Sequence, residues 1–393
     1  MHDVPRSLEA APARVAAPIP KFPRDPRLDV FRGLCLVMIF INHVPGNFYE
    51  DYTSRNFGFS DAAEGFVLMS GIAAGLAYSA DFRDVSMRLW TGLARVWRRV
   101  WTLYLVHILT TFAALAAAAA VALWLNDSEI LFENQMKWVW MDPLRTLIGL
   151  ILLTHQFGYV NILPLYLVLL AVSPLLLFVA WRQPMRLWAA SALLWLVSGI
   201  WYLSLPNWPT KGGWFFNPLT WQVIFVTGLL TGVAMKDGRR LIPVKRWLQV
   251  GTGLFLLYAA LSAQFQPISK ITGQTLWLAK ETFHLPWNLT AFDKTFQTAP
   301  RLLHILALAY FLSSFAFVRR ACAHRIFAPF ELLGRQALPV FALGSVLCIG
   351  MQGIKHVTGQ DLLTDTLLIT GGLALQFALA AAKQYWPKPP KVS

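Results

Sequence analysis

The sequence predicts an all-α polytopic membrane protein with about ten transmembrane helices and one further segment that is re-entrant or interfacial. Of its 393 residues, 56% are hydrophobic and only 14% are charged, whereas a soluble domain is about 25% charged. A chain so poor in charge cannot cover a globular surface with polar groups. This excludes a cytosolic globular enzyme, a disordered protein and a fibrous protein.

The apolar runs follow one another along the chain after a Pro/Ala/Arg-rich segment, residues 1–27. That segment has no apolar stretch, so it is expected to be a flexible cytoplasmic tail and not a signal peptide. A span needs about 20 residues, and ten runs qualify: 29–48, 62–80, 100–125, 160–180, 187–204, 219–235, 247–264, 302–318, 337–354 and 362–381. The transmembrane domain is therefore expected over 28–384, with a short cytoplasmic tail at 385–393.

Loop charge decides how the short eleventh apolar run, 144–157, is interpreted. If it does not cross and the N-terminus is inside, 24 of the 34 Lys and Arg residues lie in cytoplasmic segments. If it crossed, the basic loop 236–246 would face outward, against the positive-inside rule. We therefore expect both termini inside and 144–157 to be re-entrant or interfacial. The excess of 34 basic over 20 acidic residues then reflects topology and not nucleic acid binding.

Three ionisable residues, Asp29, Arg32 and His43, lie in the first apolar run. Charges within a span are costly, so the default interpretation is a functional site. Arg32 and His43 are eleven residues apart, which places them on one helix face and roughly 16 Å apart along the axis; Asp29 can pair with Arg32. The alternatives are that Arg32 is a snorkelling or salt-bridged topology anchor and that His43 packs at the headgroup level.

Asp61 and Glu64 open the second run on its outer side, close in the membrane plane to His43. A carboxylate beside an imidazole can fix its tautomer and raise its basicity, as in hydrolases and acyltransferases. The Asp61-x-x-Glu64 spacing is also that of a capping box, with Asp61 as N-cap. Both interpretations remain open for Glu64, whereas the capping role is the stronger one for Asp61.

Arg95, Arg98 and Arg99 cluster in the expected cytoplasmic loop 81–99. Arginine matches phosphate geometry, so this cluster suits a phosphorylated cytoplasmic donor; the alternative is a topology anchor with interfacial tryptophans. The outer loops 205–221 and 265–300 are rich in aromatic and amide side chains, which suit a sugar or, alternatively, form an aromatic belt. They include Trp208, Trp214, Phe215, Phe216, Trp221, Trp277, Trp287 and Asn288.

The Arg-x10-His spacing of Arg32 and His43 resembles the signature of the acyltransferase-3 superfamily of membrane O-acyltransferases. The string RDPRLDVFRGLCLVMIFINHVPGNF, followed by FGFSDAAEGFVLMSG, is similar to one branch in particular. That branch is the OpgC family, which succinylates osmoregulated periplasmic glucans in Gram-negative bacteria. The close resemblance covers about residues 24–80, and the rest of the chain agrees in hydropathy.

This resemblance implies an acyl-CoA-dependent O-succinyltransferase in the bacterial inner membrane. His43 is similar to the superfamily's essential histidine, Arg32 to its essential arginine, and Arg95, Arg98 and Arg99 to its arginine motif. The implied donor co-substrate is an acyl-CoA, namely succinyl-CoA, and the implied acceptor is a periplasmic glucan, without a metal or a permanently bound cofactor.

In the implied reaction, His43 acts as general base on a glucan hydroxyl and Glu64 orients its ring. Arg32 or a helix dipole stabilises the thioester or the developing oxyanion. Asp29 and Asp61 complete the candidate site.

A transporter of a polysaccharide or small molecule is the main alternative, with Asp29, Arg32 and His43 as a proton or substrate relay. It predicts flux without acyl turnover and indifference to acyl-CoA. No internal repeat is visible, which disfavours a transporter built from inverted repeats. A structural scaffold is less favoured still, because it gives no reason to place a cation and an imidazole on one helix face.

Overall fold

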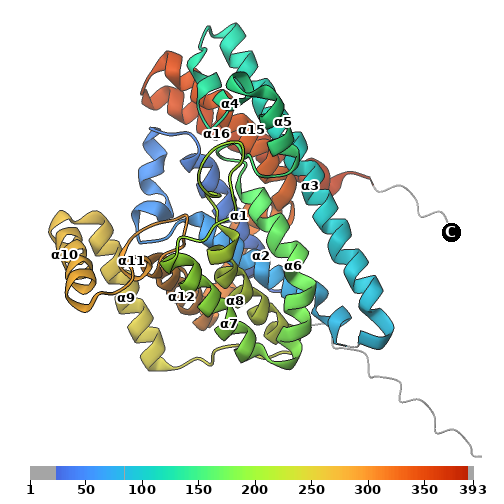
Figure 1. Cartoon of the computed structure of the whole chain (residues 1–393), viewed down its shortest axis with the longest axis vertical. Coiled ribbons are helices and arrows are strands. Elements are labelled where there is room, and N and C mark those ends of the chain that lie inside the picture. Colours follow the sequence, from blue (N-terminus) through green and yellow to red (C-terminus); the bar gives the residue numbers. More distant parts are fainter. Residues whose placement is uncertain (1–23, 84, 388–393) are drawn as a thin grey trace, which may run out of the picture.

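The computed structural model describes residues 24–83 and 85–387, and this part of the chain is helical without a β-strand (Figure 1). The α-helices are α1 (Pro26–Asn42), α2 (Ala62–Tyr78), α3 (Val85–Trp124), α4 (Lys137–Met141), α5 (Pro143–Ile151), α6 (Ile162–Arg182), α7 (Pro184–Ile200), α8 (Pro218–Lys236), α9 (Arg246–Gln264), α10 (Gln266–Phe283), α11 (Trp287–Thr290), α12 (Ala299–Ser314), α13 (Ala316–Cys322), α14 (Ala328–Arg335), α15 (Ala337–Thr358) and α16 (Leu362–Tyr385). The predicted tails lie largely outside the described residues, and α1 begins at Pro26, two residues before the expected domain boundary.

Six described helices are long and apolar enough to cross a membrane, and two bent pairs raise the number to eight. The six are α2, α3, α6, α8, α15 and α16; the pairs are α9 with α10, bent by 111°, and α12 with α13, bent by 85°. Each of the ten predicted runs contains a helix, since α1 and α7, with 17 residues each, account for the other two. The segment 144–157 forms only the nine-residue α5 and a turn, which is shorter than the roughly 17 residues that a span requires.

The prediction of a loop is wrong for two segments, because both contain helical turns. The segment 81–99 contains the first turns of α3, a continuous helix of 40 residues that begins at Val85. Good helix formers such as Leu, Ala and Arg occur there, and hydropathy alone gives no sign of a charged helical turn. The outer segment 265–300 likewise contains α10, a helix of 18 residues whose side chains are mostly exposed.

Local sequence signals set where the helices at the site begin. The Asp25 side chain accepts a hydrogen bond from the Arg27 amide at 3.1 Å, and Pro26 occupies the first helical position of α1. The α8 helix repeats this pattern, with the Asn217 side chain accepting from the Leu219 amide at 3.1 Å and Pro218 following Asn217. Both patterns satisfy exposed backbone amides and fix the first turn.

Glycines allow two helix pairs to approach closely. On α2 and α8, the spacing Gly71-x3-Gly75 meets Gly228-x3-Gly232, and a Cβ placed on Gly71 would lie 2.2 Å from the Phe225 carbonyl oxygen. The α1 and α14 helices meet similarly, since a Cβ on Gly334 would lie 1.8 Å from the Asp29 carbonyl oxygen. Small residues at this spacing are typical of helix association in membranes.

Replacing Gly71 with leucine is therefore expected to lower the free energy of unfolding by about 1–3 kcal/mol or more, because the side chain overpacks a backbone contact. A thermal melt of the purified protein in detergent measures the change. Gly350→Leu in α15 is the matched control, since a Cβ there meets nothing within 4 Å. Equal melting temperatures for the two variants would contradict close packing between α2 and α8.

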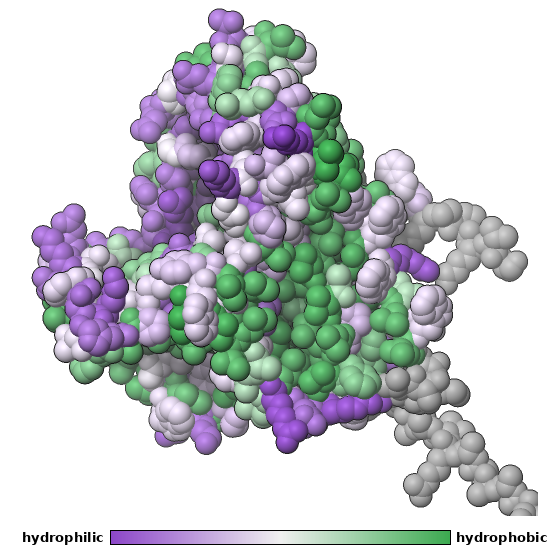
Figure 2. Space-filling model, viewed as in Figure 1, coloured by the Kyte–Doolittle hydropathy of each residue, from purple (hydrophilic) through white to green (hydrophobic). Residues whose placement is uncertain are grey.

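Much of the helical surface is apolar and exposed. Leu105, Leu109 and Phe112 on α3 are 49%, 70% and 43% exposed, and Figure 2 shows a broad apolar surface across the middle of one face with hydrophilic residues along its lower edge. Exposed apolar area of this extent is typical of a surface that contacts lipid or protein. The long apolar helices identify that contact as the membrane.

Candidate functional site

A cavity of about 800 Å³ lies at the end of the helix bundle where α1 and α7 end and where α2, α6, α8 and α12 begin. Its walls combine amide, aromatic and charged side chains. The lining residues include Asn42, His43, Arg55, Phe59, Asp61, Asn134, Gln135, Gln156, Tyr159, Asn161, Asn207, Trp214, Phe215, Phe216, Lys294 and Arg301. Its size is within the range of about 300–1,000 Å³ that is usual for ligand sites.

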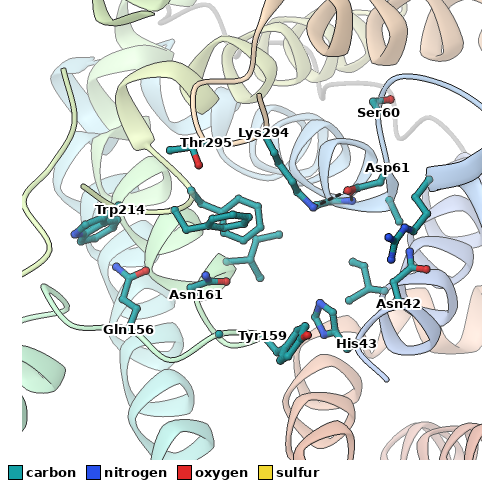
Figure 3. Close-up of a pocket in the computed structure, with 18 of the residues that line it drawn as sticks. Asn42, His43, Ser60, Asp61, Gln156, Tyr159, Asn161, Trp214, Lys294 and Thr295 are labelled. Atoms are coloured by element: carbon teal, nitrogen blue, oxygen red, sulfur yellow. Dashed lines mark hydrogen bonds and ion pairs between the residues drawn. The ribbon is translucent and has the colours of Figure 1, made fainter. Parts of the chain in front are cut away.

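His43 is the residue that ends α1, and its ring lines this cavity beside Tyr159 (Figure 3). The two ring centroids lie 4.4 Å apart with planes inclined at 53°. Gln352 Nε2 donates to the His43 carbonyl oxygen at 2.7 Å, and Asn134 Nδ2 donates to Gln352 Oε1 at 2.9 Å. The His43 backbone is therefore fixed against α15 while its ring faces the cavity.

A second, much smaller cavity of about 10 Å³ also borders His43. It is lined by Leu36, Ile39 and Phe40 of α1, by Phe341, Gly344 and Ser345 of α15, and by Gln376 of α16. Ile39, His43 and Phe341 line both cavities. The large polar cavity and this small, mostly apolar space therefore adjoin at these three residues.

Asp61 and Glu64 form the predicted capping box at the start of α2. Asp61 Oδ1 accepts from the Ala63 amide at 2.8 Å, and Glu64 Oε2 accepts from the Asp61 amide at 3.1 Å. Two cations from a distant part of the chain complete the cluster. Lys294 Nζ donates to Asp61 Oδ2 at 2.6 Å, and Arg301 Nε donates to Glu64 Oε1 at 2.8 Å.

The cations also set the charge of Asp61. Burial alone would raise the pKa of its carboxyl group, but Lys294 and Arg301 lie beside it and outweigh burial. The pKa of Asp61 is therefore held below its usual range. Asp61 stays ionised at neutral pH and keeps the Lys294 ammonium at the cavity wall.

The expected contact between Glu64 and the His43 ring does not occur among the described residues. The Glu64 side chain is fully buried and is occupied by Arg301 and the Asp61 amide. A charged arginine is a stronger partner for a buried carboxylate than a neutral imidazole. The ring neighbour that the structure gives His43 is Tyr159.

Asp29 and Arg32 lie toward the other end of α1, outside the large cavity. They pair as predicted, with Arg32 Nη1 3.4 Å from Asp29 Oδ1, but Arg24 binds the same carboxylate more tightly, at 2.6 and 2.8 Å. Arg32 also donates to the Gly334 carbonyl oxygen at 3.3 Å. Arg32 lies one helical turn from Leu36, which lines the small cavity, so both share the helix face of His43.

Arg95, Arg98 and Arg99 lie on α3 and not in a loop. Arg95 forms an ion pair with Asp81 and Arg98 is exposed, while Arg99 is half-buried. None of the three lines either cavity. These arginines therefore form a basic surface on the N-terminal half of α3, away from the cavity that His43 lines.

The large cavity contains part of the predicted aromatic and amide set. Trp214, Phe215 and Phe216 line it, whereas Trp208, Trp221, Trp277, Trp287 and Asn288 do not. Amide side chains complete the wall: Asn42, Asn134, Gln135, Gln156, Asn161 and Asn207. Aromatic faces with convergent amide donors and acceptors are suited to a polyhydroxylated ligand.

Several site residues could not be identified from the sequence. Lys294 and Arg301 meet Asp61 and Glu64 across more than 230 residues, and Gln352 meets His43 across 309. Neither spacing carries a local signal. A cation at the start of an apolar run, as at Arg301, suggests that a buried carboxylate partner exists, but it does not say which carboxylate that is.

Comparison with protein families matches residues 24–388 to the family model described as OpgC protein. The match includes both cavities and the two ends of α1. No curated protein and no solved structure matches the chain. The family match therefore covers the whole described fold and is not confined to the N-terminal string.

Proposed function

The chain belongs to the OpgC protein family, and from that premise we propose that it is a membrane O-acyltransferase that succinylates a periplasmic glucan. The donor is cytoplasmic succinyl-CoA, and the acceptor is a glucan hydroxyl that enters the large cavity. The observation that carries this proposal is the position of His43, which combines a fixed backbone with a ring on the wall of an amide- and aromatic-lined cavity.

The topology in this proposal has ten spans: α1, α2, α3, α6, α7, α8, α9, α12, α15 and α16. Both termini lie in the cytoplasm of a Gram-negative cell, and the membrane is the inner one. This arrangement keeps 24 of the 34 Lys and Arg residues on the cytoplasmic side, as the positive-inside rule requires. The large cavity then opens toward the periplasm, and Asp29 and Arg32 lie toward the cytoplasm.

The donor approaches His43 from inside the bundle. Its phosphates bind the basic surface of Arg95, Arg98 and Arg99, and its pantetheine arm passes Arg32 along the shared face of α1. Arg32 lies roughly 16 Å from His43 along the helix axis, so we assign it to the donor and not to the reacting carbonyl. The small cavity below His43 lies on this route, on the same face one turn beyond Arg32. Its volume is only about 10 Å³, so the surrounding side chains have to move to admit the pantetheine arm.

The chemical step is one acyl transfer. The neutral His43 imidazole takes the proton of a glucan hydroxyl, and the oxygen attacks the thioester carbonyl. The carbon–sulfur bond breaks, and the departing CoA thiolate takes the proton from the imidazolium. Glu64 is proposed to act indirectly, since it holds Arg301 and Asp61 in place at the cavity wall.

Replacing both Arg98 and Arg99 with alanine is expected to weaken CoA binding about tenfold or more, because each charged hydrogen bond to phosphate contributes roughly 1.5–3 kcal/mol. Calorimetric titration of the purified protein with CoA measures the effect. Arg182→Ala/Arg186→Ala in α6 and α7 is the matched control, since both arginines are exposed. Unchanged CoA affinity in the Arg98/Arg99 variant would count against this donor site.

The proposed function is tested by incubating the purified protein with a panel of acyl-CoAs and a neutral glucan, followed by mass spectrometry of the glucan. A mass increase of one succinyl group, with release of CoA, is the expected result. Absence of transfer from every acyl-CoA would overturn the proposal. Glucan movement into vesicles without acyl turnover would favour the transporter alternative.

A further inference from the structure

Lys294 has an unusual position among the charged groups of the large cavity. It follows Asp293 in the segment between α11 and α12, and its side chain extends along the wall that faces His43 and Tyr159 (Figure 3). The Lys294 side chain is 28% exposed, compared with 13% for Arg301. Of the two cations that bind Asp61, Lys294 therefore has the more exposed side chain.

The donors and acceptors of the Asp61 cluster are not all occupied to the same extent. Asp61 accepts from the Ala63 amide, from Lys294 and from Arg301 at 3.4 Å, so its two oxygens are engaged. Arg301 directs two of its nitrogens at Glu64. An ammonium group has three N–H donors, and among the described residues only the bond to Asp61 is formed by Lys294.

The surroundings of Lys294 make it suited to an anion. Its nitrogen lies 5.6 Å from the centre of the Phe216 ring, so one side of the ammonium faces an aromatic ring. Asp61 and Glu64, the nearest carboxylates, are held by the start of α2 and by Arg301. A partly desolvated cation with spare donors binds a carboxylate more strongly than a hydroxyl group.

We propose that Lys294 binds the distal carboxylate of a dicarboxylic acyl group while the reacting carbonyl lies at His43. This inference rests on the proposed function and specifies which acyl groups the same site selects. In a succinyl group the second carboxylate is two methylene groups beyond the carbonyl that reacts. Extended from His43 into the large cavity, this carboxylate would meet Lys294 on the facing wall. Arg55 also lines the cavity, but it is paired with Glu50 at 3.4 Å, outside the Asp61 cluster.

The test compares succinyl-CoA with butyryl-CoA, in which a methyl group replaces the distal carboxylate. The kcat/KM ratio of the two donors is measured with a neutral glucan, so that only the donor supplies a carboxylate. Lys294→Met, which keeps the length of the side chain, is expected to lower the preference for succinyl-CoA about 10- to 100-fold. Lys294→Arg is expected to keep most of that preference.

Lys211→Met is the matched control, because Lys211 is exposed in the neighbouring loop and does not line the cavity. The thermal melt of each variant checks that the protein is folded. An unchanged preference in folded Lys294→Met would overturn the inference, as would an equal loss with both donors, which would indicate a role at the glucan hydroxyls.

A second arm distinguishes the two sources of a carboxylate. An acidic glucan replaces the neutral one, with butyryl-CoA as donor. If Lys294→Met weakens the use of the acidic glucan but leaves the donor preference intact, the carboxylate site belongs to the acceptor and the inference is overturned. If the wild-type protein transfers no acyl group at all, it is the proposed function that fails.

Discussion

Replacing His43 with glutamine is expected to lower the rate of acyl transfer by about 10²- to 10⁴-fold, the usual contribution of a positioned general base. Glutamine keeps a polar side chain of similar size but cannot take a proton at neutral pH. The backbone contacts of residue 43 with Ile39 and Gln352 do not involve the side chain. The fold is therefore expected to survive, and the loss is expected in kcat more than in CoA affinity.

The measurement is the rate of succinyl transfer by the purified variant, together with its melting temperature and CoA affinity. His284→Gln is the control, because His284 is an exposed histidine at the end of α10. If His43→Gln transferred succinyl within tenfold of the wild-type rate, His43 would not be the base.

Replacing Arg301 with methionine is expected to have the largest effect on stability, about 3–5 kcal/mol, because it leaves the buried Glu64 carboxylate without its counter-charge. The Glu64 side chain is fully buried and that of Arg301 is 13% exposed. Removing one partner leaves a charge that neither water nor Lys294, which is bound to Asp61, replaces. A thermal melt in detergent measures the loss.

The double variant Glu64→Gln/Arg301→Met provides the sharper test. It removes both charges, and glutamine retains an oxygen that can accept from the Asp61 amide. Because a neutral pair costs far less than a single buried charge, the double variant is expected to recover most of the lost stability. Arg145→Met breaks an exposed pair with Asp142 and is expected to cost at most about 1 kcal/mol. Equal losses in the single and double variants would mean that the ion pair is not what Arg301 contributes.

Hydropathy predicted the helices that face lipid, since every predicted run contains one. It did not predict where helices continue into polar sequence. The first turns of α3 carry Arg95, Arg98 and Arg99, and α10 carries Lys270 and Lys280. A hydropathy window responds to the contrast between lipid and water, whereas these turns are helical because of propensity and packing.

The candidate site was predictable only where its signals are local. The capping box of Asp61 and Glu64 follows from their spacing, and it formed as predicted. The pairing of Asp29 with Arg32 follows from spacing in the same way. The partner of Glu64 was not predictable, because Arg301 is 237 residues away in the sequence. Whether Glu64 contacts His43 or Arg301 depends on tertiary packing.

The glycine contacts determine which helices can move relative to one another. Where α1 meets α14 and α2 meets α8, backbone lies against backbone, and helices in such contact cannot slide or rotate past each other without a clash. Each of these two pairs is therefore expected to move as a unit, the first ending at His43 and the second beginning at Asp61. In the proposed reaction, widening of the donor passage is then expected from α16, whose Gln376 lines the space below His43, because α15 is bound to the His43 backbone through Gln352.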